Sequence, residues 1–190
     1  SYTLYMKGKS FSCDGILSEK MKAIQLASNQ FLLATQYFID NADEFNIIKN
    51  KIYAAGSSAG AETVLQAVYG NRSLAKYFKL TLPTNFRYAG LISGAGAIAD
   101  INNVNPSTQI PALFFHGTCD KLVPYATAPH HYCNGDAPGW LMLFGAHTIH
   151  QKLVNELNES SYLVTYIGGG HEYAGKPFSE EKETILGFIN

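Results

Sequence analysis

The sequence predicts one α/β domain in which a mostly parallel sheet is covered by helices on both faces. Short apolar strands alternate with longer helical segments along the chain, and the strands are apolar at every position. Strands of this kind are buried on both faces, as in parallel sheets whose connections are helices. A length of 190 residues suits one domain with a substantial core. Because no repeat, low-complexity tract or linker divides the chain, we assign residues 1–190 to a single domain.

The first third of the chain supplies a long helix and then a strand. Residues 1–5 are expected to form the end of a strand, and a polar loop follows. A helix is predicted from about Ser18, which we take as its N-cap. Its apolar positions recur every three or four residues, so one face is buried: Ile24, Ala27, Phe31, Ala34 and Phe38. The next strand is expected at 51–55.

The remaining elements repeat this alternation. A helix is predicted over 61–69, with Gly70 as a C′ residue, and a connection runs from 69 to 84. Further strands are expected at 88–93, 111–115 and 162–167. Further helices are expected at 146–157 and from Ser179, as N-cap, to the end of the chain.

Composition excludes several classes of function. Hydrophobic residues make up 46% of the chain, charged residues 15%, and the net charge is −1. No basic stripe is present, so we do not expect a nucleic-acid partner. The longest apolar runs fall far short of the roughly 18 residues that indicate a membrane span.

The sequence Gly56-Ser57-Ser58-Ala59-Gly60 lies between a predicted strand and a predicted helix. A Gly-x-Ser-x-Gly pattern in this setting is typical of a nucleophile elbow, where a serine occupies a strained turn and small neighbours allow strand and helix to approach closely. Ser58 is therefore the candidate nucleophile.

Two further candidates follow other predicted strands. Asp120 comes soon after the strand 111–115, and His171 comes after the last strand. In an open α/β sheet, functional groups gather at the carboxyl ends of the strands. A histidine can remove the serine proton, and an aspartate can orient that histidine and stabilise its charged form. Asp136 is an alternative acid, but it follows no predicted strand.

Cysteines and histidines outside this group carry weaker predictions. Cys119 and Cys133 lie fourteen positions apart, and they either form a disulfide or remain thiols. A disulfide would indicate an oxidising compartment, which slightly favours a periplasmic or secreted protein over a cytoplasmic one. Cys13 is left free or paired outside the chain. His147 and His150 share a helix, but no third ligand has suitable spacing, so no metal is predicted.

Together these motifs resemble the bacterial carboxylesterase and lipase-like branch of the α/β-hydrolase superfamily. The resemblance rests on 56–61, on 116–124, on 170–172 and on the segment 5–11. It implies hydrolysis of a small carboxylic ester through an acyl-serine intermediate, without a cofactor. It also implies that the backbone N–H of Ala59 is one donor of the oxyanion hole.

The resemblance also predicts elements that the sequence before Ser58 does not contain. Family members place a strand, an oxyanion loop and a helix upstream of the segment with which this chain opens. We therefore expect these 190 residues to be the C-terminal two-thirds of a larger hydrolase fold. Besides an ester, the expected partner is a missing N-terminal segment or, alternatively, a second copy in a homo-oligomer.

Two other functions fit the same residues. A serine peptidase uses the same triad and fold, and a catalytically impaired hydrolase fold could serve as a binding module. For the ester hydrolase, five aromatic residues are candidates for the substrate pocket: Tyr5, Phe11, Tyr125, Trp140 and Tyr173. Their identities do not specify the acyl group or the alcohol.

Overall fold

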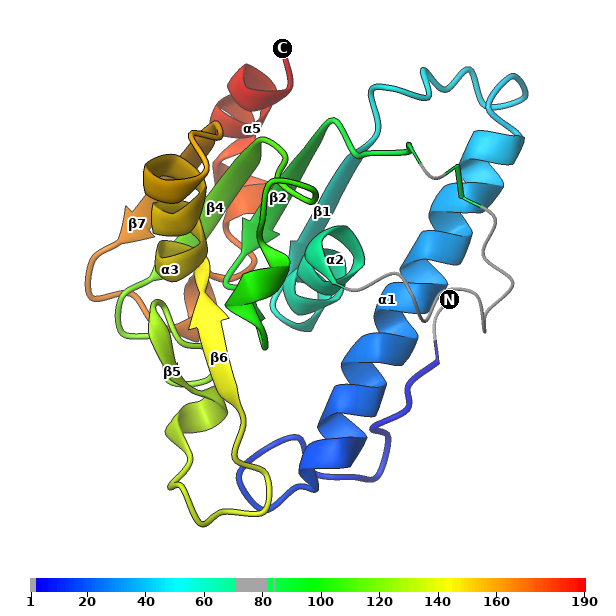
Figure 1. Ribbon diagram of the computed structural model, residues 1–190. Helices are drawn as coiled ribbons and strands as arrows, with labels where there is room; N and C mark the ends of the chain where they lie inside the picture. The colour runs from blue at the N-terminus through cyan, green and yellow to red at the C-terminus, as the bar shows by residue number, and fades with distance from the viewer. Residues whose placement is uncertain (1–2, 71–81, 84) are drawn as a thin grey trace.

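The central feature of the fold is a four-stranded parallel sheet (Figure 1). A computed structural model describes residues 3–70, 82–83 and 85–190. The strands are β1 (Tyr53–Ser57), β2 (Gly90–Gly94), β4 (Ala112–Gly117) and β7 (Ser161–Tyr166), in the order β1-β2-β4-β7. Every neighbouring pair is parallel. The predicted α/β class is confirmed.

Alternate side chains of the buried strands point to opposite faces of the sheet, and each face has its own core. Leu91 and Phe114 belong to the larger core, which includes α2 (Ala59–Tyr69) and α3 (Ala146–Gln151). Ile92 and Phe115 belong to a second core with residues of α5 (Lys182–Ile189). Helices therefore cover both faces, as predicted.

The long helix α1 (Leu17–Asp40) lies on the outer side of α2, at the β1 end of the sheet (Figure 1). Its Leu32 and Phe31 pack into the larger core. Among the described residues, β1 pairs only with β2. The second edge of β1 therefore has no strand beside it in this part of the chain.

A second sheet was not predicted. It is antiparallel, with the order β3 (Ala97–Ile98), β6 (Met142–Gly145), β5 (Thr127–Pro129). Strands of two to four residues are too short to show a periodicity, which is why the sequence pattern gave no signal. Its strands lie in the segments that follow β2 and β4 along the chain.

Several element boundaries differ from those predicted. The residue before α1 is Ile16, and Ser18 lies inside the helix, so the predicted N-cap is wrong. Thr3 to Tyr5 form coil and turn and not a strand, while residues 1–2 lie outside the described residues. Gly70 ends α2 with φ −64°, which is not the left-handed C′ conformation predicted.

The C-terminal helices are also divided differently. A π-helical turn (Lys152–Glu156) continues α3. The last helix is two helices, α4 (Pro177–Glu180) and α5. Ser179 lies within α4, where its hydroxyl donates to the Lys176 carbonyl at 3.1 Å, so it does not cap the final helix. Most of the predicted connection between 69 and 84 lies outside the described residues.

Of the two alternatives considered for Cys119 and Cys133, the disulfide between them does not form, and the expectation that Cys13 is free or pairs outside the chain is wrong. Cys133 pairs with Cys13, and their Cα atoms are 5.3 Å apart. The side chain of Cys133 is buried against the N-terminal loop, whereas Cys119 is an exposed free thiol. A short separation in sequence therefore did not identify the pair, because the fold brings together loops 120 residues apart. No helix within the described residues is long and apolar enough to cross a membrane.

Candidate active site

The turn between β1 and α2 holds Ser58 in an unusual backbone conformation. Its φ and ψ are 53° and −124°, which a non-glycine residue adopts only when its surroundings enforce it. The Ser58 N–H donates to the Gly94 carbonyl at 2.8 Å, which ties the turn to the neighbouring strand. A Cβ at Gly56 would lie 2.3 Å from the Gly60 carbonyl oxygen, so the first glycine of the motif is needed for the close approach. Gly60 itself has open space around its Cα.

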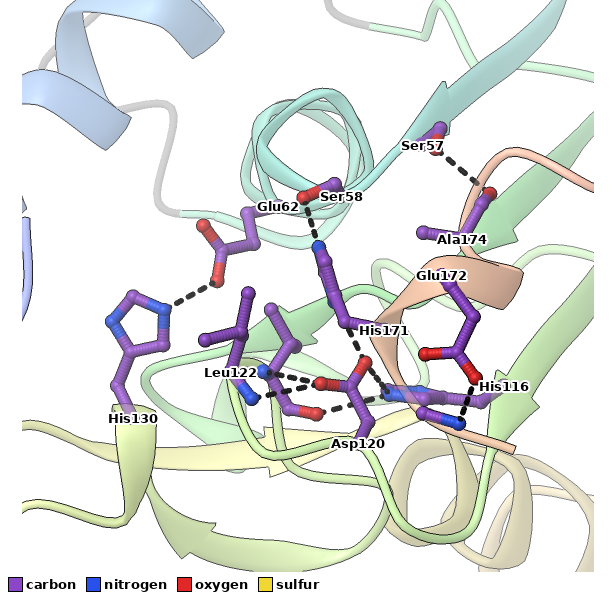
Figure 2. A network of polar contacts seen from close by, with 12 residues as sticks. Ser57, Ser58, Glu62, His116, Asp120, Leu122, His130, His171, Glu172 and Ala174 are labelled. Carbon is purple, nitrogen blue, oxygen red and sulfur yellow. Dashed lines mark hydrogen bonds and ion pairs between the residues drawn. The ribbon is translucent and has the colours of Figure 1, made fainter. Parts of the chain in front are cut away.

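Ser58, His171 and Asp120 form a continuous hydrogen-bonded chain (Figure 2). The Ser58 Oγ lies 2.7 Å from His171 Nε2. On the other side of the ring, His171 Nδ1 lies 2.8 Å from Asp120 Oδ2. With the proton on Nδ1, the ring donates to the carboxylate and accepts from the serine hydroxyl. Asp136 is exposed in its loop, whereas Asp120 supplies the carboxylate that contacts this histidine.

The Asp120 carboxylate is buried and held from several directions. It is 1% exposed, and its Oδ1 accepts from the backbone N–H groups of Leu122 at 2.9 Å and Val123 at 3.0 Å. Burial alone would raise the pKa of Asp120, but hydrogen bonds from His116, His171 and these two N–H groups outweigh it. They hold the pKa well below its usual range, so the group is an anion with a fixed orientation.

The loop that carries His171 is brought to Asp120 by glycines at the ends of two strands. A Cβ at Gly117 would lie 2.3 Å from the Gly169 carbonyl oxygen, so only glycine permits this approach. The same carbonyl accepts from the N–H of Cys119 at 2.9 Å. The hydrogen bond to Asp120 raises the pKa of His171 above its ordinary value of 6.5, against the opposing effect of burial.

His116 contacts the Asp120 carboxylate, a role that no motif in the sequence predicted. Its Nε2 lies 3.1 Å from the Val123 carbonyl oxygen and 3.3 Å from Asp120 Oδ2. Because a carbonyl only accepts, Nε2 carries the proton and points it between the two oxygens. The signal in the sequence was the spacing of four residues between His116 and Asp120, which a turn after a strand can close.

Glu62 and His130 form a second buried polar group near Ser58 (Figure 2). Their Nε2 and Oε1 atoms are 3.7 Å apart, and both side chains are 3% exposed. Burial lowers the pKa of His130 to about 3 and raises the pKa of Glu62 to about 7. Because His130 is then neutral, the contact is not an ion pair. No sequence motif pointed to a role for Glu62.

A pocket of about 390 Å³ opens beside Ala59, the first residue of α2. Two of the candidate pocket residues, Tyr5 and Phe11, line it, and Glu62 contributes to its wall. The other wall residues are mostly apolar: Leu4, Met6, Ala23, Ile24 and Ala27, together with Thr3, Lys7 and Thr63.

The three other aromatic pocket candidates do not line this pocket. The Tyr125 hydroxyl pairs with Thr165 at 2.9 Å, and its ring packs against two histidines. The ring of Tyr173 packs on Tyr166 at 4.8 Å between centroids. The backbone N–H of Trp140 donates to the Ala137 carbonyl and closes a turn there.

The structure offers no cluster of three or more metal-ligating side chains within residues 3–70, 82–83 and 85–190. His147 packs its ring against Tyr125. His150 Nδ1 lies 2.9 Å from the Ser161 hydroxyl. The two helical histidines thus have separate neighbours.

The fold and this site define an α/β protein. A serine lies at the turn after β1, and a histidine and an aspartate are hydrogen-bonded in line with it. Among solved structures, the chain is similar to one titled as the crystal structure of esterase PE8, with a TM-score of 0.55 and 18% sequence identity. The match covers 87% of this chain and 63% of that esterase, so the chain spans less than two-thirds of its length. At this identity the likeness shows the fold alone. No family model and no curated protein matches the sequence.

Proposed function

We propose that the protein is a serine hydrolase that cleaves carboxylic esters. The observation that carries this proposal is the hydrogen-bonded chain from Ser58 through His171 to Asp120. A serine hydroxyl is a weak nucleophile until a base removes its proton, and this arrangement supplies that base with a fixed tautomer. The similar structure titled as an esterase and the neighbouring apolar pocket are consistent with an ester substrate.

The geometry supports a two-stage reaction. Ser58 Oγ attacks the ester carbonyl carbon while its proton passes to His171 Nε2, and the Asp120 carboxylate stabilises the resulting imidazolium. The carbonyl oxygen becomes an oxyanion. The backbone N–H of Ala59, which directly follows Ser58 at the start of α2, is the candidate donor to this oxyanion. When the tetrahedral intermediate collapses, the proton passes from His171 to the leaving alcohol.

The second stage regenerates the enzyme. A water molecule gives its proton to His171 Nε2 and attacks the acyl-serine ester. The second tetrahedral intermediate then releases the carboxylic acid and returns the proton to Ser58 Oγ. No redox step or cofactor is needed, since every bond change is a transfer of an acyl group or a proton.

The test compares the wild type with Ser58→Ala. We expect the wild type to hydrolyse nitrophenyl acetate and to be labelled by a fluorophosphonate, and the variant to do neither. Ser57→Ala is the matched control, since its hydroxyl donates to the Ala174 carbonyl at 2.8 Å and not to the histidine. Failure of the folded wild type both to hydrolyse the ester and to react with the probe would refute the proposal.

The same experiment separates the alternative functions. Cleavage of aminoacyl nitroanilides in preference to esters would identify a peptidase. A folded protein with neither reaction would instead support the binding module.

A further inference from the structure

Glu62 is a buried acid that the proposed mechanism does not use. It lies one helical turn after Ser58, since its N–H donates to the Ser58 carbonyl at 3.0 Å. Its side chain lines the pocket beside Ala59, yet the residue is only 3% exposed. In Figure 2 the carboxyl group turns away from the Ser58 hydroxyl toward His130.

One carboxyl oxygen of Glu62 has no hydrogen-bond partner among the described residues. This atom, Oε1, is fully buried, and it lies 3.7 Å from His130 Nε2, beyond hydrogen-bond distance. Leaving a buried oxygen unpaired costs about 1–3 kcal/mol. A buried group without a partner calls for a physical explanation, such as backbone strain, a bound water or ion, or a functional role, and buried acids with shifted pKa values cluster at functional sites.

The pocket around Glu62 favours a particular chemistry. Most of its walls are apolar, formed by residues such as Met6, Phe11 and Ile24. The group that enters is therefore mainly hydrocarbon, with one polar atom for the carboxyl.

We propose that this pocket receives the part of an ester that carries a hydroxyl group, and that Glu62 hydrogen-bonds that hydroxyl. The proposal rests on the ester hydrolase proposed above and specifies its substrate class.

Charge near Glu62 explains the choice of a neutral hydroxyl. The buried ammonium of Lys20, whose Nζ donates to the Gly139 carbonyl at 2.6 Å, already acts on Glu62 as a positive charge. A cation in the pocket would meet the positive charges of Lys20 and of Lys7, which lines the wall, and an anion would meet the carboxylate. A hydroxyl both donates and accepts, so it pairs with Glu62 in either protonation state.

The experiment measures substrate discrimination in two matched pairs of esters. The first pair, nitrophenyl butanoate and nitrophenyl β-hydroxybutanoate, places the hydroxyl on the acyl side. The second pair, propyl butanoate and its hydroxyethyl counterpart, places it on the alcohol side. We expect the wild type to prefer the hydroxylated ester in one of the pairs by about 5- to 10-fold in kcat/KM, the value of one hydrogen bond.

Three variants test whether Glu62 is responsible. Glu62→Met should reduce the preference to about 1-fold, because it keeps the volume and removes the hydrogen bond. Glu62→Gln should retain most of it. Glu156→Gln, which changes an exposed glutamate, should leave it unchanged. A purely structural Glu62 would lower the activity on both members of a pair equally and leave their ratio intact.

The outcomes distinguish this proposal from the ester hydrolase itself. No preference in the wild type, or a preference that survives in Glu62→Met, would overturn the role of Glu62 while esterase activity stands. A binding measurement decides without turnover: ligand-observed NMR on Ser58→Ala should show, in one of the two ester pairs, tighter binding of the hydroxylated ester than of its partner, and the difference should vanish when Glu62→Met is added. Equal affinities in Ser58→Ala would overturn the proposal even for a protein that hydrolyses no ester.

Discussion

Replacing Asp120 by Asn should abolish nearly all ester turnover while leaving the fold in place. In the folded protein, Asp120 Oδ1 accepts two backbone N–H groups, from Leu122 and Val123. The asparagine carbonyl oxygen will keep these two bonds, because an NH₂ group there would face two donors. The NH₂ group then takes the place of Oδ2, 2.8 Å from His171 Nδ1. It also faces His116 Nε2 at 3.3 Å, and the proton of that nitrogen keeps the Val123 carbonyl as its acceptor.

An NH₂ group at this place donates to Nδ1, so the proton of the neutral ring moves to Nε2. In that tautomer Nε2 cannot accept from Ser58, which lies 2.7 Å away. The corresponding loss in serine hydrolases with this arrangement is about 10⁴ in kcat, or about 5.4 kcal/mol of activation free energy at 1.36 kcal/mol for each tenfold change.

Steady-state hydrolysis of nitrophenyl acetate measures this loss, and circular dichroism checks that the variant is folded. Asp136→Asn is the matched control, because that side chain is exposed, and it should keep the wild-type rate. If folded Asp120→Asn keeps kcat within about tenfold of the wild type, or if Asp136→Asn loses activity instead, the assignment of the acid and the tautomer argument are both wrong.

The other predictions concern pH, the disulfide and the core. The pKa of His171 is raised above 6.5, and the protonated ring cannot accept from serine. The kcat/KM should therefore fall as pH drops through a midpoint above 6.5, and a measured midpoint below 6.5 would contradict this. Cys13→Ser should lower the free energy of unfolding by at most about 5 kcal/mol, since the bond to Cys133 closes a loop of 120 residues. Cys119→Ser should leave urea unfolding unchanged, and equal effects of the two serine variants would argue against this pairing. Phe114→Ala, at a fully buried position of the sheet, should cost about 3–5 kcal/mol in the same unfolding measurement, and a loss below about 1 kcal/mol would mean that this core is loosely packed.

The parts of the fold that the sequence predicted are those with a strong local signal. The strand before Ser58 and the helix after it, the buried strand that includes Phe114, and the last strand are all present within a few residues of their expected positions. Continuous apolar runs and helical periodicity depend only on neighbours in sequence, so they can be recognised without the fold.

What the sequence could not provide depends on contacts between distant segments. The partner of Cys133 is 120 residues away, and the strands of the small antiparallel sheet are stabilised by each other and not by their own pattern. The contact of His116 with Asp120 and the burial of Glu62 likewise appear only once the loops are placed. Ser58, Asp120 and His171 could be proposed because each follows a recognisable strand.

Formation of the site reports on a late step of folding, because its three side chains follow strands that are far apart in sequence. Ser58 and His171 are 113 residues apart in sequence, and His171 and Asp120 are 51 apart. Contacts over such separations form slowly, because the chain entropy of closing long loops must be overcome first. During refolding, helical circular dichroism should therefore return before ester turnover does, and the interval between them would measure how long the first and last strands of the sheet take to reach their places.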